Sequence, residues 1–208
     1  MMNDFRFELS SNAIYLLACL LALIFSCNAL AYDVIVNKEE RPDPWVINGC
    51  TIKPETQCEG ADLRHADLKN ANLEGANLEG ANLARANLQH ANLTGANVRW
   101  TNLDGANLEE AFISKADFTG ASLYGANLMF ARMIKADMNH TNLTAATLEA
   151  AWANKAQFVG ARFINTDLQE TKLEYANLKN AIMRGTNIKF ATFPGANMEG
   201  CDGCPFDW

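Results

Sequence analysis

From Ala61 to Gly200 the sequence keeps one five-residue frame through 28 consecutive units. In every unit the first position is Ala or Thr and the third position is apolar. A period of five gives an α-helix no apolar face, because successive third positions would lie about 140° apart. A straight strand is excluded too, since successive third positions would point to opposite sides. The chain must therefore turn once in every unit, which predicts a solenoid.

The five positions of the unit predict where each side chain lies. The first and third positions are two residues apart, so both point to the same side of an extended segment, and we expect both to face inward. The second position, usually Asn or Asp, then faces solvent, and stacked amides such as Asn87, Asn107 and Asn127 should form ladders. The fourth and fifth positions are Gly, polar or charged in most units, which is typical of a corner.

A tandem of Ala-(Asp/Asn)-Leu-x-x units of this length resembles the pentapeptide-repeat family, and the resemblance covers residues 61–200. It implies an all-β fold: a right-handed quadrilateral β-helix with 20 residues per coil and about seven coils. Lys115, Lys135 and Lys155 recur at that interval. Asp117 and Asp137 lie across a corner from the first two lysines, and we expect them to offset the stacking of like charges.

The N-terminal segment predicts export. Residues 13–27 are apolar, and Ala29-Leu30-Ala31 follows in the pattern of a cleavage site, so Tyr32 should begin the mature chain in the periplasm or outside the cell. An uncleaved anchor is an alternative, although the run is short for a membrane span of about 20 residues. A lipoprotein cleaved at Cys27 is another. The predicted organisation is a signal peptide at 1–31, a leader and N-terminal cap at 32–60, the repeat at 61–200 and a C-terminal cap at 201–208.

Four cysteines remain after removal of residues 1–31, and an even number in an exported chain predicts disulfides. Cross-pairing would have to span the solenoid, about 30 Å at 4.8 Å per coil, whereas a disulfide needs Cα atoms within about 7 Å. We therefore expect the pairs Cys50–Cys58 and Cys201–Cys204. The second pair could instead be a redox motif or part of a zinc site, but no room remains for a following helix and no further ligands are near. Apolar residues that should plug the two ends are Trp45, Val46, Ile47, Ile52, Phe206 and Trp208.

Charge excludes some classes of partner. The formal net charge of the chain is −7, but residues 61–200 contain 13 Lys and Arg against 14 Asp and Glu. The solenoid is thus nearly neutral. The sequence contains no basic patch that would indicate nucleic-acid binding. It also contains no long acidic run that would indicate a mimic of the DNA backbone.

No group of residues predicts catalysis. The three histidines, His65, His90 and His140, all occupy fifth positions on different faces, and we interpret them as solvated corner residues. Glu109 and Glu110 are adjacent, but no cleft is expected around them. A convex rod with a filled core should offer no pocket. We therefore predict that the protein is not an enzyme and has neither a cofactor nor a metal site.

One surface feature predicts a contact. With 20 residues per coil, every fourth unit lies on the same face, and the third face consists of the unit at 71 and every fourth unit after it. The second positions of this face then stack so that an arginine lies between two aromatic rings, about 5 Å from each neighbour. A lysine column lines the fifth positions of that face. This pattern indicates a patch for a protein or glycan partner, although the stacked rings could simply stabilise the ladder. The candidate contact residues are Phe112, Arg132, Trp152, Lys115, Lys135 and Lys155.

Three functional hypotheses follow. The first is an exported, non-enzymatic structural or protein-interaction solenoid whose partner and oligomeric state the sequence does not give. The second, implied by the resemblance to the family's quinolone-resistance members, is a DNA mimic that binds a type II topoisomerase; the signal peptide and the near-neutral rod argue against it. The third is a thiol redox protein that uses Cys201 and Cys204. Cell fractionation separates the second hypothesis from the first, and thiol titration separates the third.

Overall fold

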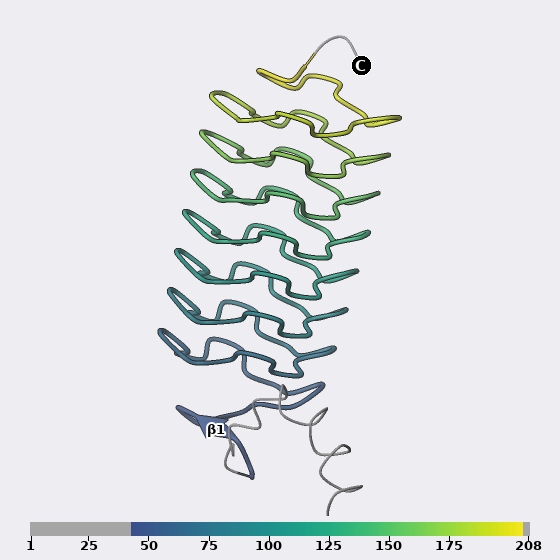
Figure 1. The fold of residues 1–208 in the computed structure, drawn as a ribbon. Coiled ribbons are helices and arrows are strands. Elements are labelled where there is room, and N and C mark those ends of the chain that lie inside the picture. The colour runs from purple at the N-terminus through teal and green to yellow at the C-terminus, as the bar shows by residue number, and fades with distance from the viewer. Residues whose placement is uncertain (1–42, 206–208) are drawn as a thin grey trace, which may run out of the picture. The chain divides into compact units, whose positions relative to one another are not determined.

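The computed structural model describes residues 43–205, which form a stack of similar coils (Figure 1). The fold is the predicted all-β, right-handed quadrilateral β-helix, and the described residues contain no helix. The predicted signal peptide, most of the leader, and the end-plugging residues Phe206 and Trp208 lie outside the described residues.

A short hairpin precedes the coils. Strand β1 (Val46–Ile47) pairs antiparallel with strand β2 (Cys50–Thr51), with Val46 opposite Thr51. The two connecting residues, Asn48 and Gly49, have φ values of 47° and 82°. Two left-handed residues in succession are the geometry that Asn-Gly favours in a two-residue hairpin turn.

Every coil contains 20 residues, as expected. The second position of each unit forms a parallel bridge with the residue 20 positions later, from Gln57–Asn77 to Ile182–Asp202. Each bridge is supported by backbone hydrogen bonds such as Leu63 N–H to the Asn82 carbonyl at 2.8 Å. The repeat thus begins at residues 56–60, one unit before the frame that is evident in the sequence.

The fifth position of every unit makes the corner. All 28 fifth-position residues between 61 and 200 have φ between 53° and 70°, in the left-handed region. Eighteen of them are not glycine, and none is Val, Ile or Thr. Branching at Cβ is the side-chain feature least compatible with this backbone conformation. The corner therefore disfavours β-branched residues at the fifth position and accepts glycine there.

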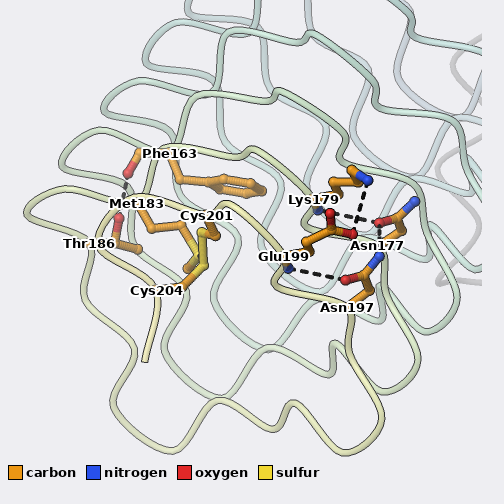
Figure 2. Close-up of a disulfide and its surroundings, with 9 residues drawn as sticks. All are labelled: Phe163, Asn177, Lys179, Met183, Thr186, Asn197, Glu199, Cys201 and Cys204. Atoms are coloured by element: carbon orange, nitrogen blue, oxygen red, sulfur yellow. Dashed lines mark hydrogen bonds and ion pairs between the residues drawn. A yellow bond between two sulfur atoms is a disulfide. The ribbon is translucent and has the colours of Figure 1, made fainter. Parts of the chain in front are cut away.

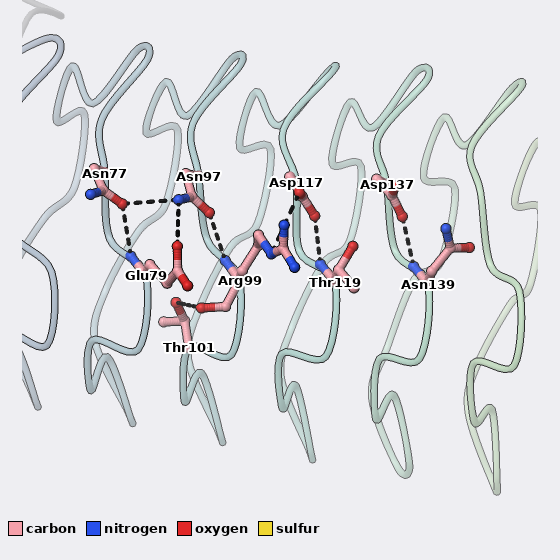
Figure 3. Close-up of polar contacts among 9 residues, drawn as sticks. All are labelled: Asn77, Glu79, Asn97, Arg99, Thr101, Asp117, Thr119, Asp137 and Asn139. Atoms are coloured by element: carbon pink, nitrogen blue, oxygen red, sulfur yellow. Dashed lines mark hydrogen bonds and ion pairs between the residues drawn. The ribbon is translucent and has the colours of Figure 1, made fainter.

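The second-position amides do two things at once (Figure 3). The Asn97 side-chain oxygen accepts the Arg99 backbone N–H at 3.3 Å, which caps the corner that follows. Its amide nitrogen donates to the Asn77 oxygen one coil earlier at 3.0 Å, and to Glu79 at 3.0 Å. The ladder was expected and the cap was not. Aspartate caps in the same way, as Asp117 does by accepting the Thr119 N–H at 2.9 Å. It can also accept from the ladder, as Asp167 does from the Asn187 side-chain amide at 2.9 Å.

The core is dry and closely filled, as predicted. Between residues 61 and 200 the first- and third-position side chains are buried, except for a few partly exposed ones at the two ends of the stack: Ala61, Thr186, Ile188, Ala196 and Met198. Phe158 packs edge-on against Phe163, with ring centroids 5.1 Å apart. Where threonine replaces the first-position alanine, its hydroxyl donates to a third-position carbonyl, as from Thr171 to Leu148 at 2.8 Å. Among the described residues no buried side-chain polar atom lacks a hydrogen-bond partner.

Both ends have a disulfide with the predicted pairing. Cys58 occupies a buried third position and is bonded to Cys50, with an S–S distance of 2.01 Å. Cys201 is bonded to Cys204, whose buried sulfur lies 3.2 Å from the Met183 sulfur (Figure 2). Each bridge therefore covers one end of the apolar column.

Candidate functional site

The third face consists of the seven units that begin at residues 71, 91, 111, 131, 151, 171 and 191. Its second positions bring Phe112, Arg132 and Trp152 together in three successive coils. The guanidinium carbon of Arg132 lies 4.9 Å from the Phe112 ring centroid and 5.7 Å from that of Trp152. The stacked arrangement predicted from the 20-residue period is thus present.

The rings leave the edges of the guanidinium free. Arg132 is exposed, and its side chain has no hydrogen-bond or ion-pair partner among residues 43–205. Phe112 and Trp152 remain 38% and 51% exposed. The flat sides of the cation are therefore covered, whereas its N–H donors face solvent.

A hollow surrounds this stack, so the expectation that the rod has no pocket is wrong. The depression has a volume of about 390 Å³ and is lined by Arg132, its two stacked rings, and three residues of the adjoining corner: His90, Glu110 and Phe130. Folding at 20 residues would have placed those three in one column.

The hollow continues along the solenoid. A second depression of about 370 Å³ shares His90 and Phe112 with the first and extends to Asn72. Together they form a groove parallel to the stacking direction, which we call the third-face groove. On its wall His90 Nδ1 lies 3.4 Å from Glu110 Oε2, so His90 is paired rather than simply solvated.

The lysine column lies at the opposite corner of the third face. Lys115, Lys135 and Lys155 are exposed, and the described residues provide no carboxylate in ion-pair contact with any of them. The aspartates expected to compensate these lysines therefore make no direct ion pair with them. Asp117 contacts Arg99 at 3.9 Å, and Asp137 accepts the backbone N–H of Asn139 at 3.0 Å. Both carboxylates turn toward their own face because they cap its corner.

The near-neutral total conceals a separation of charge between faces. The third face carries five Lys and Arg against two Asp and Glu, whereas the second face, which begins at residue 66, carries two against six. The two acids of the third face are Glu74 and Glu174, and Glu174 accepts hydrogen bonds from Asn154 and Thr192. The three units that start at 111, 131 and 151 contain no acid.

Exposed aromatic side chains gather on the same face. Within residues 43–205 eight large hydrophobic residues are exposed, and only Val46, Trp100 and Tyr124 lie elsewhere. The five on the third face or its two corner columns are Phe112, Phe130, Trp152, Tyr175 and Phe190. Aromatic surface, unpaired cations and a groove thus coincide on one face of four.

Other parts of the described chain offer little chemistry. Residues 43–205 contain no cluster of three or more His, Cys, Asp or Glu placed to hold a metal ion. They also include no helix that could cross a membrane. On the first face the hydrogen bonds from Arg64 lower the pKa of Asp62 to about 2, but both side chains of this pair are exposed to solvent. Cys204, a residue of the redox hypothesis, is buried and bonded to Cys201.

Comparison with known proteins agrees with the fold. The family of pentapeptide repeats matches residues 61–200 in overlapping segments. The solved structure of Rfr23, from the cyanobacterium Cyanothece 51142, is 26% identical over 54% of this chain and 88% of its own, with a TM-score of 0.51. HetL, from Nostoc sp. strain PCC 7120 and involved in regulating heterocyst differentiation, is 25% identical over 73% of this chain and 86% of its own, with a TM-score of 0.48. Among curated proteins there is no significant match.

Proposed function

The chain belongs to the pentapeptide-repeat family, and from this premise we propose that it is an exported, non-enzymatic solenoid that binds a protein partner through its third face. The observation that carries the proposal is the coincidence of exposed aromatics and unpaired cations around the third-face groove. Aromatic residues and arginine are the side chains most enriched at the centres of protein interfaces.

The interior supports a binding role over a catalytic one. First- and third-position side chains fill the coil, and buried threonine hydroxyls such as those of Thr166 and Thr171 donate to backbone carbonyls. The groove is shallow and open along its length, whereas small-molecule sites enclose most of their ligand. A macromolecular partner fits such a surface better than a small substrate does.

Export rests on the sequence of residues 1–31 and on cysteine pairing. The four cysteines of the predicted mature chain form two local disulfides, an arrangement typical of oxidising compartments. Cell fractionation with mass analysis of the purified protein tests this part. A mature chain that begins at Tyr32 and contains no free thiol supports export, and a cytoplasmic chain that keeps residues 1–31 and has six free thiols contradicts it.

The partner itself is tested by quantitative capture from the exported fraction. The double variant Phe130→Ala and Trp152→Ala should capture less of the partner protein than the wild type does. A matched control combines Trp100→Ala with Tyr124→Ala, which removes aromatics of similar exposure from other faces. Equal loss in both double variants, or loss in neither, would count against a partner site on the third face.

One observation favours the DNA-mimic alternative, namely the acid excess of the second face. Its six acids belong to four separate coils, and an ionised surface of this kind could contact a protein that binds DNA. A supercoiling assay with a purified type II topoisomerase tests this function. The carboxylates concerned are Asp67, Glu109, Glu110, Glu149, Asp167 and Glu170.

A further inference from the structure

Arg132 has the features of a preorganised anion receptor. Phe112 and Trp152 hold its guanidinium from both sides, so little side-chain freedom is lost when a ligand binds. Its free N–H edges form a planar fork that matches a carboxylate in a bidentate arrangement. No described residue occupies that fork. The side chain is therefore held in place for a partner that the chain does not itself supply.

The lysine column adds a line of positive charge beside the receptor. Lys115, Lys135 and Lys155 occupy equivalent positions in successive coils, which are spaced by about 4.8 Å. Stacked like charges repel each other, and the nearby Asp117 and Asp137 are engaged elsewhere. A ligand with several negative groups would relieve this repulsion along its length.

The groove sets the shape of the ligand. The two adjoining hollows run from Asn72 to Trp152, parallel to the solenoid axis. One wall of the groove is formed by Phe130 and by the paired Glu110 and His90. A ligand in the groove therefore meets the column of His90, Glu110 and Phe130 on one side and the stacked Arg132 on the other. The lysine column lies beyond that stack, at the opposite corner of the third face.

Resting on the proposed function, we infer that the third face recognises an extended acidic segment of the partner protein. One carboxylate of that segment pairs with Arg132, others lie along the lysine column, and an apolar side chain packs against Phe130. A polypeptide can present acids on one side and an apolar group on the other, because successive side chains of an extended chain alternate. A membrane surface or a broad polyanion would also approach the acidic second face and be repelled.

Fluorescence anisotropy with a labelled peptide of about ten residues, long enough to span the groove, tests the inference. In the probe every second residue is Glu and the residues between them are Leu or Ser. In a second peptide Gln replaces each Glu. The wild type should bind the Glu peptide, with affinity falling as salt rises, and should not bind the Gln peptide. Arg132→Gln should weaken binding by about tenfold or more. The triple change of Lys115, Lys135 and Lys155 to Gln should weaken binding and flatten its salt dependence.

Arg162→Gln is the matched control. Arg162 occupies a second position on the first face, between Asn142 and Ile182 and without flanking rings. Its variant should bind like the wild type. Arg132→Lys keeps the charge but removes the fork, so it should resemble Arg132→Gln. Thermal unfolding of each variant checks that the fold is intact.

Several outcomes would overturn the inference: equal affinity for the Glu and Gln peptides, equal loss in the Arg162 variant, or preferential binding of heparin or of anionic vesicles over the Glu peptide. The proposed function can fail separately. If the peptide does not bind but the Phe130 and Trp152 double variant still loses a captured protein, the third face is an interface and its partner is not acidic. If neither effect is seen, both proposals are wrong.

Discussion

Ala145 and Ala146 are neighbours in the chain with opposite environments, and replacing each by glycine should have opposite effects. Ala145 is an exposed fifth-position residue with a φ of 58°. Ala146 is a first-position residue that is 1% exposed and outside the left-handed region. The same substitution therefore removes a strained methyl group in one case and a packed methyl group in the other.

The magnitudes follow from these environments. At residue 145 a Cβ in the left-handed conformation costs roughly 1–2 kcal/mol, whereas the added freedom of glycine in the unfolded chain costs about 0.4–1 kcal/mol. Ala145→Gly should thus raise the free energy of unfolding by about 0.5–1 kcal/mol. Ala146→Gly relieves no strain and also loses a buried methyl worth about 0.8 kcal/mol, so it should lower the free energy of unfolding by about 1–2 kcal/mol.

Denaturant unfolding followed by circular dichroism measures both variants against the wild type. Gly125→Ala is the reverse control, because a Cβ added at Gly125, where φ is 64°, meets no atom within 4 Å. This variant should be destabilised by backbone strain alone, by about 0.5–1 kcal/mol. If Ala145→Gly destabilises as much as Ala146→Gly does, the left-handed corner is not what constrains the fifth position.

Three further predictions concern single interactions. Thr171→Val removes a buried hydroxyl that donates to a carbonyl and should lower the free energy of unfolding by about 1 kcal/mol; a variant as stable as the wild type would show that this bond contributes nothing. The Asp62 carboxyl should titrate by NMR with a pKa of about 2, and Arg64→Gln should return this pKa toward 3.8. Because the folded-state pKa is depressed, any stability that this exposed pair contributes is present above the unfolded-state pKa. That stability is lost as pH falls through the folded-state pKa. Replacing Cys201 and Cys204 together by serine should lower the free energy of unfolding by about 2 kcal/mol, as expected for so short a closed loop; unchanged stability would contradict a structural disulfide.

The coil could be predicted from the sequence because its determinants repeat. A third-position apolar residue in 28 units requires a turn in every unit to bury the set. The resemblance to the pentapeptide-repeat family implies the 20-residue interval, and the stacked Phe112, Arg132 and Trp152 follow from it. The hairpin of β1 and β2 was not predicted, although Asn48-Gly49 is a strong turn signal.

What was not predicted depends on side-chain direction. The sequence places Asp117 across a corner from Lys115, but the carboxylate caps its own corner instead, and spacing alone does not decide between those contacts. The groove was missed for a related reason, because an inward-filled coil gives no indication of relief on its outer surface. His90 and Phe130 line that groove from a corner column that only the folded arrangement sets beside Arg132.

The central claim is that a partner binds to the third face. Oxidative footprinting of the two tryptophans that are exposed within residues 43–205 tests it most directly. Trp152 on the third face is 51% exposed and Trp100 on another face is 59% exposed, so each serves as a reference for the other. Adding the exported fraction should slow oxidation of Trp152 and leave that of Trp100 unchanged. If the fraction changes the oxidation rate of neither tryptophan, or protects Trp100 alone, the account is contradicted.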